Sequence, residues 1–320
     1  MTSTTKEVTR TSTDGSYTGG LALALTSATS FGLSGSLAFS LLDMGWSPAA
    51  VVVTRVGGAF LVLLIPCLFL LRRIGLPTGR QGARILAYGA VAIALAQLCY
   101  FSAVQYLSVG VALLLEYLAP VMLIGWHWAR THRRPAVPVL AGAGLSIVGL
   151  AFVLDLHGGL TLNLVGVVWG LAAALCLCAY FLLSEDNGAD APVNPLLLTT
   201  AGTGIGAALL LAAAGVGIIP FTAHAGMTIL ADQAVGWWLP AALLILISAV
   251  LAYPTGIVAV RRLGSSLASF VSLTEVIFAV IFAFVLLGQR PGPMQLVGGA
   301  LILTGIALVQ RPQRSVGDRR

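Results

Sequence analysis

The chain has 320 residues, of which 58% are hydrophobic and only 9% are charged, whereas about 25% of the residues in a soluble domain are charged. This composition excludes a soluble enzyme, a disordered regulator and a nucleic-acid binder, and it indicates a protein embedded in a lipid bilayer. The formal net charge of +6 then reflects membrane topology rather than an acidic partner.

Ten apolar segments follow one another along the chain, and each is close to the roughly 20 residues that a membrane-spanning helix needs. Helices are expected throughout, because an open strand in lipid leaves backbone groups unpaired. The segments are predicted at 19–42, 48–71, 84–105, 108–129, 137–154, 162–183, 195–219, 237–260, 265–287 and 293–310. A disordered tail rich in Ser and Thr is predicted at 1–18, and a basic tail at 311–320.

Basic residues divide unequally between the two ends of these segments. If the N-terminus is cytoplasmic, fifteen Lys and Arg residues lie on the cytoplasmic side, Arg290 lies outside, and Arg55 falls inside a helix. Cytoplasmic loops of membrane proteins carry an excess of Lys and Arg. We therefore predict a multi-pass protein of the cell membrane, most naturally a bacterial cytoplasmic membrane, with both termini in the cytoplasm.

The second half of the chain repeats the first at a shift of 156 residues. The matched pairs include Leu140 with Leu296, Gly142 with Gly298, Gly149 with Gly305, and Gln97 with Tyr253. The first two helices of each half match at a shift of 147, which places nine extra residues in the connection that contains His224 and Asp232. The predicted repeats are 19–156 and 157–310. Each holds five helices, an odd number, so the repeats cross the membrane in opposite directions, an arrangement typical of secondary transporters.

Several motifs resemble the EamA-type, ten-helix members of the drug/metabolite transporter superfamily. They are Leu118-Ala119-Pro120, Arg262-Leu263-Gly264-Ser265, Leu273-Thr274-Glu275 and Leu287-Gly288-Gln289-Arg290. The stretch from Ala112 to Pro120 is most similar to the threonine/homoserine-exporter branch. The resemblance extends from about residue 19 to 310 and implies a ten-helix exporter of small metabolites. The chain departs from the family pattern at Val276 and Gln289, where the family usually has Pro and Glu.

Three charged residues fall well inside the predicted helices: Arg55, Glu116 and Glu275. A charge at the bilayer centre costs about 3 kcal/mol on insertion scales, so such residues usually face a cavity or a partner. Arg55 and Glu116 have similar predicted depths, and they either form a structural ion pair or take part in substrate or proton handling. Glu275 lies near the midplane without an obvious partner. We hypothesise that Glu275 or Glu116 exchanges a proton with substrate during alternating access.

Polar and aromatic residues inside the helices are further candidates for the substrate site. They are Gln97, Tyr100, Tyr180, Tyr253, Phe31 and Trp169. For each one alone, an interhelical hydrogen bond or core packing is the alternative. Tyr117 is expected to point away from Glu116 and to be structural. Gly32, Ser36 and Ser40 recur every four residues and predict a close-packing stripe on the first helix.

The predicted function is secondary active export of small metabolites, amino acids or related compounds, by alternating access with proton coupling. The alternatives are an uncoupled facilitator or channel, and an exporter of organic cations or drugs. A zwitterionic amino acid would suit one cation and two acids, and an organic cation would suit unpaired glutamates and tyrosines equally well. The expected partners are this small molecule and the lipid bilayer, with no nucleic acid; the sequence identifies no protein partner.

An enzyme is not expected, because no H-E-x-x-H, paired-Asp or Gly-x-Ser-x-Gly arrangement occurs in the sequence, and these are the patterns that such chemistry needs. No nucleotide-binding P-loop occurs either, which argues against an ATP-driven pump. The four cysteines lie in apolar runs and are interpreted as small packing residues. We therefore expect no metal and no cofactor.

Overall fold

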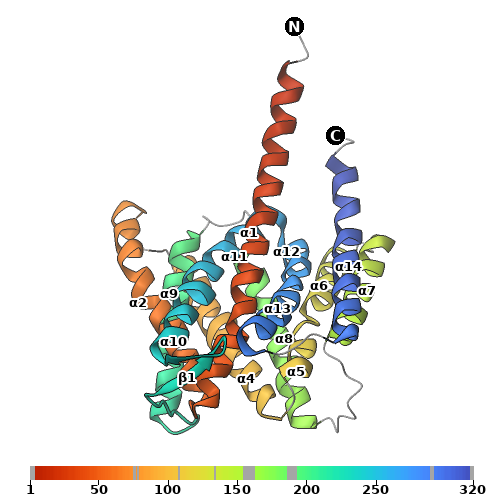
Figure 1. Cartoon of the computed structure of the whole chain (residues 1–320). Helices are drawn as coiled ribbons and strands as arrows, with labels where there is room; N and C mark the ends of the chain where they lie inside the picture. The colour runs from red at the N-terminus through yellow and green to blue at the C-terminus, as the bar shows by residue number, and fades with distance from the viewer. Residues whose placement is uncertain are drawn as a thin grey trace.

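The computed structural model of the chain describes residues 4–74, 77, 79–106, 109–132, 135–153, 163–185, 193–288 and 292–317. Arg290 and Gln289 lie outside these residues. The first half contains α1 (Thr4–Asp43), α2 (Pro48–Ile74), α3 (Gly79–Ala87), the π-helical η1 (Tyr88–Leu95), α4 (Ala96–Tyr106), α5 (Val109–Glu116), α6 (Ala119–Thr131) and α7 (Val137–Val153). These helices, with those of the second half, form one bundle (Figure 1).

The second half contains a similar series of helices and one β-hairpin. Its elements are α8 (Leu164–Ser184), α9 (Pro195–Gly215), β1 (Met227–Leu230), β2 (Gln233–Gly236), α10 (Trp238–Ile245), the π-helical η2 (Leu246–Leu251), α11 (Ala252–Leu263), α12 (Ser265–Ser272), α13 (Thr274–Leu287) and α14 (Pro293–Gly317). Seven helical segments of the described chain are long and apolar enough to cross a membrane. The protein is therefore a mostly helical, multi-pass membrane protein, while the count of ten crossings stays a prediction.

Irregular helical segments occur at equivalent places in the two halves. The π-helical segments η1 and η2 end at Leu95 and Leu251, and α5 and α12 end at Glu116 and Ser272. Both pairs are separated by the same 156 residues that relate the two halves of the sequence. Because π-helical turns often mark functional positions, and interrupted helices form the substrate sites of many transporters, these places locate the region in which a site is expected.

Helix α1 begins at Thr4 and α14 continues to Gly317, whereas tails were predicted at 1–18 and 311–320. The beginning of α1 and the end of α14 project from the same side of the bundle (Figure 1). Extending an existing helix by one residue costs far less than nucleating a new one. Polar sequence next to a stable apolar helix can therefore continue it, which composition alone does not predict.

The hairpin β1–β2 was not predicted, because only helices were expected. It lies in the connection that holds the nine extra residues, and its strands pair antiparallel, with Leu230 opposite Gln233. Ala231 and Asp232 form the turn with positive φ angles of 52° and 58°, as a two-residue hairpin turn of type I′ requires. The strands fall between the apolar segments, so the argument against open strands in lipid does not apply to them.

The hairpin is attached to the ends of two helices. The hydroxyl of Thr228 donates to the carbonyl of Ser40 at 2.9 Å, near the end of α1. The backbone N–H of Ala231 donates to the carbonyl of Leu286 at 2.8 Å, near the end of α13. The hairpin therefore joins the C-terminal ends of α1 and α13.

The last helices of the two halves, α7 and α14, pack closely against each other. A Cβ atom on Gly149 would lie 2.7 Å from the carbonyl oxygen of Gly298, and one on Gly305 would lie 2.7 Å from that of Gly142. The shift of 156 residues exchanges these two pairs. Small residues let helix backbones approach closely in membranes, which explains the glycine pattern of both segments.

Candidate substrate site

A cavity of about 350 Å³ lies inside the bundle. Residues of α1, α2, η1, α4, α5, α8, α11 and α13 line it. Eight of the nine predicted site residues are among them: Phe31, Arg55, Gln97, Tyr100, Glu116, Tyr180, Tyr253 and Glu275. The ninth, Trp169, is half-buried on α8 and does not line the cavity. A volume of this size is within the range of small-molecule sites.

Arg55 is built into the wall of this cavity. Its side chain is 5% exposed; Nη2 donates to the carbonyl of Ser248 at 2.8 Å, and Nη1 donates to Oε1 of Gln97 at 3.5 Å. The rings of Phe31 and Tyr253 lie 5.3 and 5.7 Å from the guanidinium carbon, at which distance a cation is attracted to an aromatic face. The guanidinium is therefore held from several sides by the protein itself.

Ser248 belongs to η2, and Gln97 follows η1 in the other half of the chain. Arg55 therefore bridges the two halves at their π-helical segments. Within the described part of the chain, Arg55 forms no hydrogen bond to Glu116, so the ion pair that was one alternative is not the arrangement in this structure. Electrostatic interaction still links Arg55 to both Glu116 and Glu275.

The two carboxylates lie at helix ends. Glu116 is the last residue of α5, and Glu275 is in the first turn of α13, where the positive end of the helix dipole favours a negative charge. Both side chains remain partly exposed while lining the cavity. With both carboxylates ionised and Arg55 positive, the formal charge of these three groups is −1.

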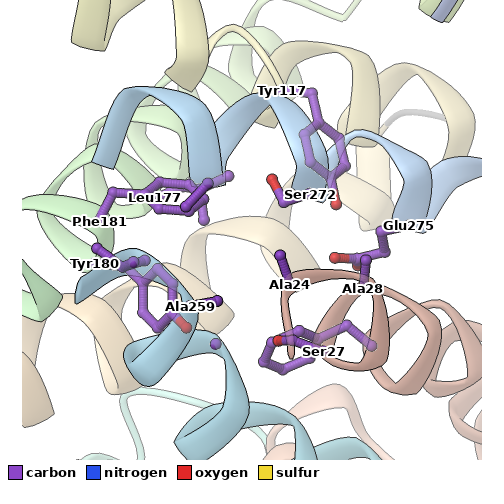
Figure 2. Close-up of a pocket in the computed structure, with 14 residues that line it drawn as sticks. Ala24, Ser27, Ala28, Tyr117, Leu177, Tyr180, Phe181, Ala259, Ser272 and Glu275 are labelled. Atoms are coloured by element: carbon purple, nitrogen blue, oxygen red, sulfur yellow. The ribbon is translucent and has the colours of Figure 1, made fainter. Parts of the chain in front are cut away.

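Tyr117 differs from its predicted position. It was expected to point away from the site, yet it lines the cavity and its hydroxyl points toward Glu275 in Figure 2. Regular helical geometry ends here, since the N–H of Leu118 bonds to the carbonyl of Leu115. Helical spacing therefore did not predict the direction of Tyr117. Pro120, in the first turn of the next helix, α6, was the available signal.

Gly32 brings α1 against the backbone of α13 beside the site. A Cβ atom on Gly32 would lie 2.9 Å from the carbonyl oxygen of Glu275 and 2.8 Å from Cβ of Phe278. The predicted close-packing role of Gly32 is confirmed by this contact. Ser36, from the same predicted stripe, is buried but lines the cavity, so the stripe also forms part of the wall.

The cavity is wide on one side and narrow on the other. It extends to Leu42 and Leu287, at the C-terminal ends of α1 and α13. On the opposite side lies a second cavity of about 60 Å³, whose lining includes Phe181 and Gly256; Figure 2 shows this cavity with Phe181 labelled. The residues that line both cavities are Phe31, Tyr117, Leu177, Tyr180 and Glu275. These five residues form the constriction between the two cavities.

Comparison with known proteins yields a family and a fold. The model of the EamA-like transporter family matches residues 18–155 and 164–311. An uncharacterized transporter of Archaeoglobus fulgidus is 27% identical over 279 residues, which cover 87% of this chain and 93% of that protein.

Two further similarities agree with this result. The uncharacterized inner membrane transporter YicL of Salmonella typhimurium is 22% identical over 238 residues, which cover 73% of this chain and 75% of that protein. A crystal structure with 18% sequence identity superposes with a TM-score of 0.67 over 94% of this chain and 99% of that one. The last similarity concerns the fold alone.

Proposed function

Because the chain belongs to the EamA-like transporter family, we propose that it is a secondary active transporter that exports a small metabolite by alternating access, with protons as the coupling ion. The observation that carries the proposal is the convergence of Arg55, Glu116 and Glu275 on one cavity inside an apolar bundle. Charged groups in a membrane interior are costly and usually serve a substrate or ion pathway.

The proposal includes the topology. The distribution of basic residues supports ten crossings with both termini in the cytoplasm, and the shift of 156 residues supports two inverted repeats, 19–156 and 157–310. In this orientation the wide side of the cavity faces outward, because the C-terminal ends of α1 and α13 lie on that side. On this topology we assign the structure to an outward-facing state, with the constriction on the cytoplasmic side of the cavity.

The charges of the cavity support the proposed proton coupling. Two carboxylates face a single arginine, so one carboxylate lacks a compensating charge and can bind a proton when no substrate is present. Loading and release of this proton on opposite sides of the membrane would link the proton gradient to substrate movement. An uncoupled facilitator has no need of this arrangement.

The test is transport in proteoliposomes with an imposed pH gradient and a pH-sensitive dye inside the vesicles. Candidate solutes are the common amino acids and simple organic amines and ammonium ions. We expect solute-dependent proton flux and gradient-driven accumulation, both strongly reduced in Glu275→Gln and Glu116→Gln. Asp232→Asn, which removes a carboxylate in the hairpin turn, is the control. Full proton-dependent transport by both glutamine variants would refute the coupling role, and equilibration without accumulation would indicate a facilitator.

A further inference from the structure

The three charged groups of the cavity differ in how available they are to a bound molecule. The Nη atoms of Arg55 already donate to Ser248 and Gln97. These bonds use two of the five N–H donors of the guanidinium, and Nε is buried without a hydrogen-bond partner in the described part of the chain. Because the whole side chain is only 5% exposed, little of this remaining donor surface is open to a carboxylate on a bound molecule.

The carboxylates are more accessible. Glu116 and Glu275 are partly exposed and line the cavity. Within the described residues, Glu116 accepts no hydrogen bond, and the hydroxyl of Tyr117 points toward Glu275 (Figure 2). Each carboxylate has about four lone-pair sites, so both retain free acceptor positions. A positively charged group that enters the cavity would find acceptors without displacing any protein contact.

The surrounding surface also suits a cation. Aromatic rings of Phe31, Tyr100, Tyr117 and Tyr253 line the same cavity, and a ring face attracts a cation within about 6 Å. Arg55 itself lies beside two of these rings, Phe31 and Tyr253, which pack edge to face on each other, so this part of the wall already stabilises a positive charge. The cavity volume of about 350 Å³ leaves room for the apolar part of an amine.

We propose that the substrate is an organic monocation, a primary amine or a quaternary ammonium, rather than a zwitterionic amino acid. This inference rests on the proposed transport function. A bound monocation brings the net charge of Arg55, Glu116 and Glu275 from −1 to zero. One bound proton does the same when the cation is absent. One cation therefore exchanges for one proton, and the exchange moves no net charge across the membrane. A zwitterion would leave the cavity at −1 and would need Arg55 for its carboxylate.

Binding to the purified protein in detergent tests the charge preference with three molecules of one skeleton. Phenethylamine is a cation, L-phenylalanine adds a carboxylate to it, and 3-phenylpropionate carries the carboxylate without the amine. By titration calorimetry, we expect phenethylamine and benzyltrimethylammonium to bind at least tenfold more tightly than phenylalanine, and 3-phenylpropionate not to bind. Equal or tighter binding of phenylalanine, or failure of both cations to bind, would overturn the inference.

Variants test whether the carboxylates of Glu116 and Glu275 cause the preference for a cation. Glu116→Gln and Glu275→Gln are expected to weaken benzyltrimethylammonium binding tenfold or more, whereas Asp232→Asn leaves it unchanged. Arg55→Lys is expected to retain cation binding. Should this variant fail to fold, the ligand series on the unaltered protein still decides the question. Cation binding that survives both glutamine variants would contradict the assignment.

Transport separates failure of this inference from failure of the proposed function. In proteoliposomes, benzyltrimethylammonium should exchange for one proton at a rate that does not change when a potassium diffusion potential is imposed. Proton-coupled transport of phenylalanine but not of the cation would refute the substrate class and leave the transporter intact. Cation movement without accumulation in a pH gradient would refute proton coupling and leave the charge preference intact.

Discussion

Replacing Gly32 by alanine is expected to separate α1 from α13 and to displace Glu275. The new Cβ atom would lie 2.8 Å from Cβ of Phe278, 2.9 Å from the carbonyl oxygen of Glu275 and 3.0 Å from the N of Ala279, whereas ordinary contacts begin near 3.4 Å. Two of these atoms belong to the backbone and cannot rotate away. The helices must therefore move apart by about 0.5 Å, and overpacking of this kind costs roughly 1–3 kcal/mol.

This cost corresponds to a fall of roughly 2–6 °C in melting temperature for a protein of this size. We would measure it by thermal unfolding in detergent, together with binding of benzyltrimethylammonium, which should weaken several-fold because Glu275 is displaced. Gly35→Ala is the matched control, since Gly35 lies one turn further along α1 and lines the same cavity, and a Cβ atom added to it would meet nothing within 4 Å. Identical melting and binding for the two variants would refute the reasoning.

Substitutions at three further positions test the packing of the halves and the hairpin. Gly149→Ala should lower the melting temperature because its Cβ would lie 2.7 Å from a carbonyl of α14, whereas Gly144→Ala on the same helix meets nothing within 4 Å; equal melting would contradict the close contact. Ala231→Gly should raise stability by up to about 1 kcal/mol, because Ala231 has a φ of 52° that glycine adopts without strain, and Ala231→Pro should lower stability. Thr228→Val should cost about 1 kcal/mol through the lost hydrogen bond to α1, measured by thermal unfolding. Thr304→Val, which loses a bond within its own exposed helix, is the control, and an equal loss in both would show that the hairpin bond adds nothing.

Much of the helical order was predictable, because the solvent imposes it. A bilayer forces apolar chain into helices of a set length, so the apolar segments and their sequence follow from hydropathy alone. The convergence of Arg55, Glu116 and Glu275 on one cavity was predictable for the same reason, since lipid does not tolerate a charge. The repeat then indicated that corresponding positions of the two halves would meet.

The contacts inside the site were less predictable. The main partner of Arg55 is the backbone carbonyl of Ser248, in a π-helical segment that has no sequence signature. Tyr117 was misplaced because regular helical geometry ends beside it. Trp169 was proposed as a cavity residue because it lies deep in its segment, but depth does not determine which face of a helix a side chain occupies. The hairpin turn lacks the Asn-Gly or Asp-Gly pair that usually signals it.

The hairpin also makes the two halves energetically unequal. In a perfectly symmetric pair of inverted repeats, exchanging the conformations of the two halves would turn an outward-facing molecule into an inward-facing one of the same free energy. The nine extra residues have no counterpart in the first half of the sequence, and the hairpin in their connection is bonded to the C-terminal ends of both α1 and α13. Closing the wide side of the cavity must carry the hairpin along or break these bonds. Under the proposed alternating-access mechanism, the resting balance between the two access states is therefore set in part by a short segment outside the substrate site.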